Sequence, residues 1–227
     1  ILLSMSNSFS QTITDIWVMT KRNLLRYQRL PQLIVFSSIQ PLMFVILFVY
    51  VFGGAINTPG VSYVNYLIPG ILVQTVLFGA MLTGVGLADD LSKGMIDRFR
   101  SLPMARSAVL MGRTITESVR NVFVVILITL AGLLMGFKID HGFGNFLLAM
   151  GLTVLFGFAF SWVSATIGLA VKNVETAQTA GFIWVFPLAF ASSIFVPVET
   201  MKHGIRVFAE HNPISYTVNT VRALTLG

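Results

Sequence analysis

The sequence predicts an all-α integral membrane protein with a single domain, residues 1–227. One reason is a run of 59 residues, 30–88, that contains no Asp, Glu, Lys or Arg. A second is composition: 55% of the residues are hydrophobic, only 11% are charged, and the mean hydropathy is +0.82. A soluble protein of this composition would have more apolar surface than it could bury. We therefore expect helices that cross a lipid bilayer.

The positions of the charged residues divide the chain into five membrane spans. A hydrocarbon core about 30 Å thick needs ~20 apolar residues per helix, so the long uncharged run holds two helices. A sequence typical of a turn, Asn57-Thr-Pro-Gly60, separates them into spans at 33–53 and 66–87. The later uncharged runs give spans at 119–137, 145–171 and 177–197. The third span is short, and we expect Arg120 and Lys138 at its ends to extend their side chains to the interfaces.

The distribution of Lys and Arg predicts the orientation. Four basic residues precede the first span, none lies between the first and second spans, and five lie between the second and third. Basic segments stay cytoplasmic, which places the N-terminus and the 88–118 loop inside. The 54–64 turn, the 138–144 turn and the tail after 198 then lie outside, and the three basic residues of that tail do not outweigh the others.

The segment 10–30 predicts an amphipathic helix at the membrane interface. Apolar residues such as Ile13, Trp17 and Leu24 recur near helical spacing, basic residues occupy other positions, and Pro31 ends the segment. Such a helix places its apolar face at the acyl boundary and its basic residues against anionic headgroups. A basic flank that only enforces topology is the alternative, and the two interpretations are compatible. At the opposite interface we expect an aromatic belt of Tyr50, Phe52, Tyr63 and Tyr66.

The chain lacks the residues of most catalytic and energy-converting sites. No Asp, Glu, Lys or Arg lies in the interior of the five predicted spans. The absence of such a group argues against an ion-coupled carrier or channel. No P-loop is present, so a nucleotide-driven process would need a separate motor. The three histidines have no metal-ligand spacing, the chain has no cysteine, and no catalytic grouping supports a membrane-embedded enzyme or assembly factor. We expect neither a catalytic residue nor a metal site.

Small and polar residues within the spans predict contacts between helices. Four pairs of small residues have the spacing that lets helices approach closely, and we favour packing within the chain over a subunit interface: Gly132 with Gly136, Ala80 with Gly84, Gly157 with Ser161, and Ala177 with Gly181. Hydrogen bonding between helices is likewise favoured for the polar residues. If a substrate crosses the bundle, the candidates to line its path are Gln74, Thr75, Ser161 and Gln178.

The 88–118 loop has a regular pattern of its own. Leu91, Met95, Phe99 and Leu102 recur on one face of a helix that Pro103 would end. An amphipathic cytoplasmic helix of this kind either lies on the membrane or docks in the groove of a partner, and composition leaves both open.

Four segments together resemble a known family. The stretch from Asp90 to Pro103, followed by Gly112-Arg113, resembles the cytoplasmic loop of ABC-2 type exporter permeases, in particular the daunorubicin-resistance (DrrB-like) subgroup. The other three are the segment 21–26 leading to Gln40-Pro41, the segment 66–70, and the segment 195–199 followed by Asn212-Pro213 and Arg222-Ala-Leu224. The resemblance covers nearly the whole chain in the right order.

The resemblance implies a six-span permease that works as a homo- or heterodimer with two cytoplasmic ABC ATPase subunits. This chain would bind no cofactor, since the partner ATPase would bind ATP and Mg. The family pattern implies re-entrant helices outside the membrane in the 198–227 segment and a sixth span, so we expect the chain to be incomplete after residue 227. The segment expected to couple to the ATPase consists of Gly94, Met95, Ile96, Asp97, Arg98, Phe99 and Arg100.

The expected function is ATP-driven export of a hydrophobic or amphipathic substrate, such as a drug or lipid, with no ATPase site in this chain. The expected location is the plasma (inner) membrane of a bacterium, in contact with membrane lipids and not with nucleic acid. An ion-coupled secondary transporter or channel remains the alternative.

Overall fold

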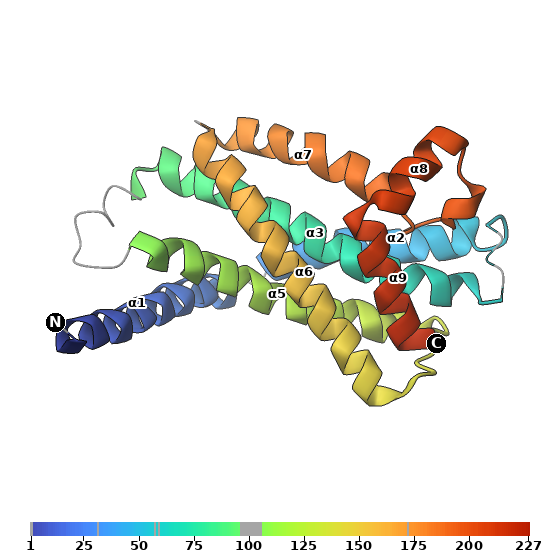
Figure 1. The fold of residues 1–227 in the computed structure, drawn as a ribbon, viewed down its shortest axis with the longest axis horizontal. Coiled ribbons are helices and arrows are strands. Elements are labelled where there is room, and N and C mark those ends of the chain that lie inside the picture. Colours follow the sequence, from blue (N-terminus) through green and yellow to red (C-terminus); the bar gives the residue numbers. More distant parts are fainter. Residues whose placement is uncertain (1, 31, 57, 59, 96–105, 172) are drawn as a thin grey trace.

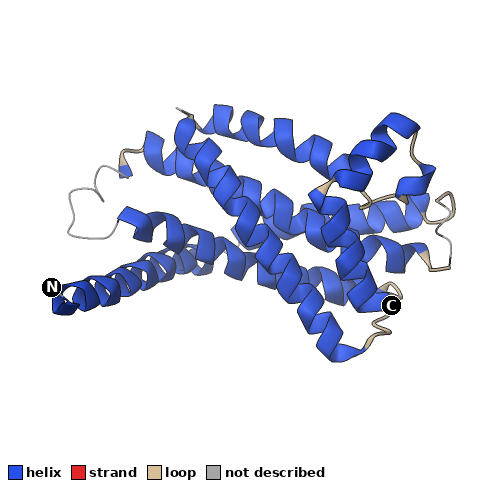
Figure 2. Ribbon diagram, in the orientation of Figure 1, coloured by secondary structure: helices blue, strands red, loops and turns tan. Residues whose placement is uncertain are grey.

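The computed structural model describes residues 2–30, 32–56, 58, 60–95, 106–171 and 173–227, and these contain helices and no strands. Figures 1 and 2 show an elongated bundle with α1 at one end and α8 and α9 at the other. The elements are α1 (Leu2–Arg29), α2 (Gln32–Leu47), the π-helical η1 (Phe48–Phe52), α3 (Tyr63–Ser92), α5 (Arg106–Leu134), α6 (Gly142–Ala170), α7 (Val174–Phe190), the 3₁₀ turn η2 (Val198–Thr200), α8 (His203–His211) and α9 (Pro213–Leu226).

Helix α3 forms the centre of the bundle. It contacts α2, α5, α6, α7 and α9, and buried residues occur on all of its faces. A helix that is hydrophobic all round is stable only where it is surrounded by other helices or lipid. Ser62 begins it by accepting a hydrogen bond from the Asn65 backbone N–H at 3.4 Å. The second half of the longest uncharged run therefore becomes the core of the protein.

Within the described residues, four helices are long and apolar enough to cross a membrane, and they match the first four predicted spans. They cover Ile34–Phe52, Tyr63–Ser92, Ser107–Leu134 and Gly142–Ala170. The fifth predicted span, 177–197, is wrong in its last residues because α7 ends at Phe190. The chain then turns, and the Phe195 ring stacks on Phe48 with ring centroids 4.5 Å apart. The turn packs on α3 at Gly70, where a Cβ atom would lie 2.5 Å from the Ile194 carbonyl oxygen.

Small residues bring the helices into close contact within the chain. Where α6 crosses α3, a Cβ on Gly168 would lie 2.1 Å from the Gly84 carbonyl oxygen, and a Cβ on Gly84 would lie 2.2 Å from that of Ser164. Gly157 and Gly181 also face side chains of α3, Val76 and Met81. Packing within the chain is thus confirmed at these positions.

The predicted pair Gly132 and Gly136 is wrong. Gly136 lies beyond the end of α5 with φ +96, and no atom is within 4 Å of its Cβ position. A residue in the left-handed region ends a helix rather than continuing its face. Gly132 alone packs, against Ile68 of α3.

The 88–118 loop is shorter than the sequence predicts, because α3 continues to Ser92 and α5 begins at Arg106. Gly94 has φ +65 and follows the end of α3, so Leu91 and Met95 do not share one continuous helical face. Residues 96–105, which include Phe99 and Leu102, lie outside the described part of the chain. Helix α1 packs along α5.

Tyr63 and Tyr66 do not belong to an aromatic belt. Both rings are buried, and their hydroxyls donate to the carbonyl oxygens of Phe195 at 3.2 Å and Ser193 at 2.9 Å. Tyr50, by contrast, is 77% exposed, as the belt prediction requires. Two of the four aromatic residues therefore hold the turn after α7 against α3.

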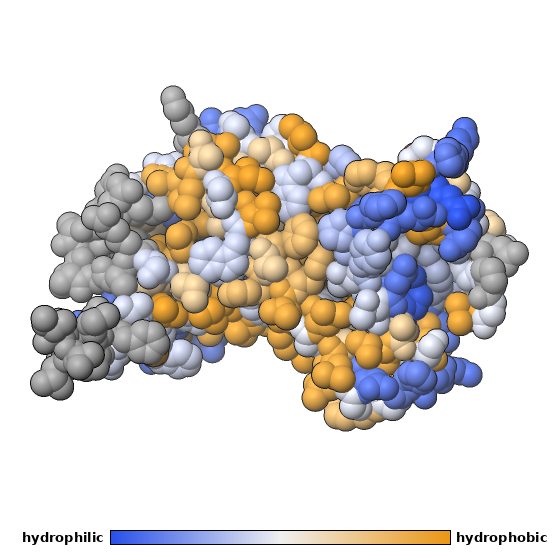
Figure 3. Space-filling model, in the orientation of Figure 1, coloured by the Kyte–Doolittle hydropathy of each residue, from blue (hydrophilic) through white to orange (hydrophobic). Residues whose placement is uncertain are grey.

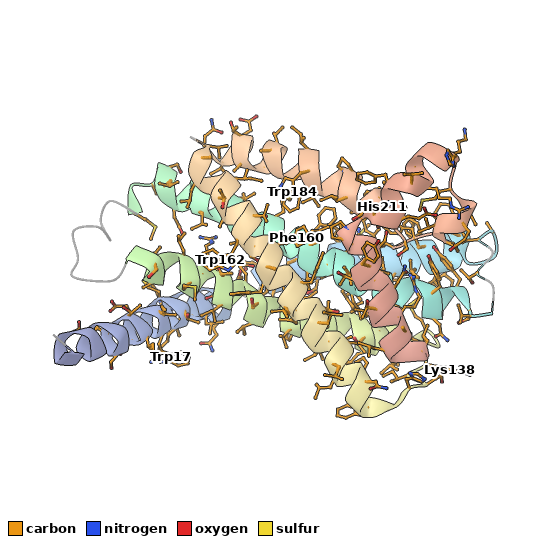
Figure 4. The ribbon with its side chains drawn as sticks, in the orientation of Figure 1. Trp17, Lys138, Phe160, Trp162, Trp184 and His211 are labelled. Atoms are coloured by element: carbon orange, nitrogen blue, oxygen red, sulfur yellow. The ribbon has the colours of Figure 1, made fainter. Side chains whose placement is uncertain are left out.

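Hydrophobic and hydrophilic residues separate on the surface. In Figure 3 hydrophobic residues cover much of the middle of the molecule, while hydrophilic residues gather near α8 and near the turn between α5 and α6. Figure 4 places Trp17 toward the α1 end, and Lys138 and His211 toward the other end. Between them the Phe160 and Trp184 rings stack, with centroids 5.8 Å apart, and join α6 to α7.

Candidate functional site

Two arginines of α5 lie against two glycines of α3. A Cβ on Gly79 would lie 2.7 Å from Nη2 of Arg120, and a Cβ on Gly86 would overlap the guanidinium of Arg113. The glycines and the arginines are each seven residues apart, which is about two helical turns. Because the helices run antiparallel, the same side of α3 receives both arginines. The two glycines thus make room for charged groups inside the bundle.

Arg120 forms a buried ion pair with Glu117. Arg120 Nε lies 3.0 Å from Glu117 Oε2, and the two side chains are only 7% and 6% exposed. Arg120 Nη2 also donates to Asn121 Oδ1 at 3.3 Å. The expectation that Arg120 extends to the interface is therefore wrong, since a carboxylate one turn away holds it inside the bundle.

Helix α1 completes the carboxylate's hydrogen bonding. The Tyr27 hydroxyl donates to Glu117 Oε1 at 2.7 Å. Burial, and then the charge of Glu117, raise the pKa of the Tyr27 phenol above its ordinary value, so it remains a neutral donor. Further along the helices, Thr116 Oγ1 donates to the Gly112 carbonyl oxygen at 2.6 Å and to that of Thr20 at 3.4 Å. These contacts fix α1 on α5 beside the ion pair.

Arg113 forms a second ion pair, near the ends of the helices that flank residues 93–105. Its Nη1 donates to Asp90 Oδ2 at 2.5 Å, which joins the last turns of α3 to the first turns of α5. The side chains are 16% and 10% exposed. The pair therefore ties together the two helices that lead into and out of that connection.

The depth of the ion pairs follows from helix geometry. Glu117 lies 17 residues before Leu134, the last residue of α5, a distance of about 26 Å at ~1.5 Å per residue. A hydrocarbon core is ~30 Å thick. If the end of α5 at Leu134 lies at one membrane face, Glu117 and Arg120 lie near the edge of the core at the α1 end.

A polar cavity of about 400 Å³ opens beside the ion pairs, between α1, α2 and α5. Its polar lining comes from Asn23, Tyr27, Ser37, Gln40, Arg113, Thr116, Glu117 and Arg120, and its apolar lining from Phe36 and Leu82. A smaller cavity of about 60 Å³ continues from it toward α3 and shares Ser37, Gln40, Leu82 and Arg120 with it. We call these two the polar cavity.

An apolar groove of about 250 Å³ runs from the polar cavity along α2. It is lined by Phe36, Ile39, Gln40, Met43, Phe44 and Leu47. Gln40 lines the groove and both parts of the polar cavity. Charged groups at one end and an apolar strip leading away from them suit a molecule with a polar head and an apolar body.

A larger cavity lies between α5 and α6 but differs in character. It has a volume of about 790 Å³ and is lined almost entirely by apolar side chains, with Ser118 and Thr129 as its polar members. It lacks the convergent charged groups that fix the orientation of a ligand. We therefore take the polar cavity and its groove as the candidate functional site.

The predicted path residues divide between this site and other places. Gln74 and Thr75 both line the smaller part of the polar cavity. Ser161 is buried and donates to the Gly157 carbonyl oxygen at 2.8 Å, away from the cavity. Gln178 is exposed near the start of α7 and does not line the cavity. Of the predicted coupling segment, Gly94 and Met95 follow α3, and residues 96–100 lie outside the described part of the chain.

Sequence reasoning missed the charged members of the site, although a signal existed. Arg113, Glu117 and Arg120 occupy i, i+4 and i+7, which is one face of a helix. A mixed-charge face next to an uncharged run is normally solvated, so the pattern alone does not point inward. Gln40 belongs to one of the segments that resemble the family, but that resemblance assigned it no role, because only the packing of α2 on α3 and α5 brings it to the cavity.

Comparison with known proteins shows the family. The model of the ABC-2 type transporter family matches residues 14–226. The chain belongs to this family. It is 33% identical, over 98% of its length and 77% of the relative's, to the daunorubicin resistance ABC transporter permease protein DrrB1 of Streptomyces coeruleorubidus.

Two relatives from Mycobacterium tuberculosis carry similar names. A protein named "Probable doxorubicin resistance ABC transporter permease protein DrrC" is 22% identical over 92% of this chain and 75% of its own length. The doxorubicin resistance ABC transporter permease protein DrrB is 26% identical over 76% of this chain and 60% of its own length. The ABC-2 chain described here is therefore a membrane permease, as its apolar helices require.

Proposed function

We propose that this ABC-2 permease is the membrane subunit of an ATP-driven exporter that moves an amphipathic substrate, a drug or a lipid, out of the cytoplasm. The observation that carries the proposal is the joined polar cavity and apolar groove, which meet at Gln40. The names of relatives as drug resistance permeases support the same substrate class.

The Lys and Arg asymmetry supports an orientation with α1 and the 93–105 connection in the cytoplasm. In that orientation α7 makes the fifth span, since its 17 residues reach the lower limit for crossing a hydrocarbon core. Helices α8 and α9 would be the outer re-entrant elements. The polar cavity would then open toward the inner leaflet, where an amphipathic molecule collects before export.

The segment from Gly94 to Arg100 would couple the permease to a cytoplasmic ABC ATPase that binds ATP and Mg. The Asp90–Arg113 ion pair supports this assignment, because it joins both ends of the connection next to the polar cavity. The exporter would work as a homo- or heterodimer of permeases in the bacterial plasma membrane, surrounded by lipid.

The buried carboxylate of Glu117 is relevant to the alternative function, an ion-coupled carrier. Glu117 accepts from Tyr27 with one oxygen and faces Arg120 with the other. Both contacts are made to side chains of α1 and α5, so they support a structural role for Glu117 beside the cavity rather than a role in ion coupling.

The test is transport by the permease and its ATPase partner in proteoliposomes, with two fluorescent amphiphiles, octadecyl rhodamine B and a short-chain phosphatidic acid. Gln40→Leu should lower ATP-dependent movement of the transported probe about 5-fold, because a lost hydrogen bond contributes ~1 kcal/mol. Gln32→Leu is the matched control, since Gln32, like Gln40, is exposed on α2 but lines neither the polar cavity nor the groove.

Equal transport by Gln40→Leu and wild type would refute the role of the cavity. Movement of either probe by the permease alone, driven by an ion gradient without ATP, would instead establish a secondary carrier. Gln178→Leu extends the series to α7, where lower transport would add that helix to the path.

A further inference from the structure

The hydrogen-bond groups around the polar cavity are out of balance. Glu117 Oε1 accepts from Tyr27, whereas Glu117 Oε2 faces Arg120 Nε at 3.0 Å without a hydrogen bond to it. Near this one unsatisfied acceptor lie three buried donor atoms without a hydrogen-bond partner in the described residues, Arg120 Nε, Arg113 Nε and Asn121 Nδ2. An unsatisfied buried donor destabilises the protein, and a ligand that supplies acceptors offsets this cost.

The charged side chains that line the cavity also favour a ligand with acceptor groups. Two guanidiniums, Arg113 and Arg120, line the polar cavity with only one carboxylate, Glu117. Asp90, which pairs with Arg113, lies outside the lining. Guanidiniums bind carboxylates and phosphates through planar, two-point contacts, and these contacts are strong where water is excluded.

The shape of the site adds a requirement for an apolar body. The groove along α2 leaves the cavity at Phe36 and Gln40 and has no charged lining residue. A free anion would satisfy the donors and leave the groove unused, while an anionic amphiphile fills both.

We propose that the polar cavity binds the anionic head, a phosphate or carboxylate, of an amphiphile whose apolar body lies in the α2 groove. This assignment rests on the proposed function and narrows its substrate class. Arg120 is the central ligand, because it lines both parts of the cavity and is fixed over Gly79. Arg113 and Asn121 supply the further donors.

Binding is measured on the purified full chain in an uncharged maltoside detergent, by titration calorimetry with three probes. Dodecyl phosphate and dodecyltrimethylammonium have the same chain and opposite charges, and inorganic phosphate has no chain. Wild type should bind dodecyl phosphate about 10-fold or more tighter than either of the others, as expected when one or two charge-assisted hydrogen bonds are added.

Two variants separate recognition from folding. Arg120→Lys keeps the charge opposite Glu117 but loses the planar fork, so it should bind dodecyl phosphate about 10-fold more weakly. Glu117→Gln removes the charged acceptor that competes for Arg120. This variant should bind dodecyl phosphate as tightly as wild type or more tightly. Arg206→Lys is the matched control, because Arg206 also pairs with a glutamate of its own helix, at 2.7 Å, but lies exposed on α8.

Several results would overturn the proposal. Tighter binding of dodecyltrimethylammonium, lost in Glu117→Gln, would make the ligand a cation. Equal binding of inorganic phosphate and dodecyl phosphate would show that the groove is not part of the site. Equal binding of dodecyl phosphate by Arg120→Lys and Arg206→Lys would show that Arg120 is not a ligand. None of these results bears on the transport test with Gln40. A failure of the anion-binding proposal can therefore be distinguished from a failure of the exporter proposal.

Discussion

At the scale of single residues, what a glycine faces decides whether it can be replaced. The Cβ position of Gly168 lies against backbone atoms of Gly84, whereas that of Gly86 lies against the flexible end of Arg113. Backbone atoms cannot move without shifting a whole helix, while a guanidinium can swing away. The crossing of α3 and α6 should therefore tolerate an added side chain less well than the site of Gly86.

Gly168→Ala should destabilise the permease by about 1–3 kcal/mol, because the added methyl overpacks a tight helix contact. Gly151→Ala, on the same helix α6, should be neutral or stabilise by up to ~1 kcal/mol, since no atom lies within 4 Å of its Cβ position and alanine is the better helix former. The measurement is the temperature at which half of the detergent-solubilised protein remains monodisperse.

Each variant adds one methyl group to α6, at a different position of the helix. Equal midpoints for Gly168→Ala and Gly151→Ala would mean that α6 does not approach α3 as closely as the structure shows.

At the scale of elements, one side chain of α9 connects three parts of the bundle. The Arg222 guanidinium donates to the Tyr66 carbonyl oxygen at 2.9 and 3.1 Å and to that of Ser193 at 2.9 Å. Its Cζ lies 3.7 Å from the centroid of the Tyr66 ring. One arginine thus connects α9, the turn after α7 and α3.

Arg222→Lys should loosen α9 from the bundle and cost about 1–3 kcal/mol, because an ammonium cannot reproduce the fork of hydrogen bonds or the stacking. Hydrogen exchange of the α9 amides, followed by mass spectrometry, should quicken relative to those of α6. Arg206→Lys is again the control, since that arginine bonds only within α8 among the described contacts.

Unchanged exchange in α9 for Arg222→Lys would show that apolar burial of Ile214, Val218 and Val221 is enough to hold the helix. Arg222 would then have no part in fixing α9 on the bundle.

At the scale of the whole molecule, the orientation in the membrane determines the role of the polar cavity. The cavity lies between α1, α2 and α5, and the site proposed for export requires the α1 end of the bundle to be cytoplasmic. The natural absence of cysteine makes the test direct, since one introduced cysteine is the only thiol.

A membrane-impermeant maleimide should label Ala55→Cys on intact cells, because the exposed turn before α3 is expected outside. Ser92→Cys, exposed at the other end of α3, should react only after the membrane is opened. The reverse pattern would invert the topology and place the cavity on the outer side.

Hydropathy predicted most of the helical architecture, because a bilayer imposes the length of an uncharged run directly. The runs that gave the first four spans correspond to α2 with η1, α3, α5 and α6. The end of the fifth span was predicted wrongly, because the uncharged run continues past Phe190 to residue 198. The chain turns there because Ile194 packs on Gly70 and the Phe195 ring stacks on Phe48.

By itself the sequence determined that the chain is a helical membrane protein, where its first four apolar helices lie, and which family it resembles. The tertiary structure alone decided where the charges near the membrane edge lie. The sequence predicts that Arg120 extends to the interface, but Gly79 and Gly86 of α3 make room for the guanidiniums of Arg120 and Arg113 inside the bundle. Burial of a charge depends on partners that a helix period cannot show, because desolvation is offset only by groups that folding brings from other helices.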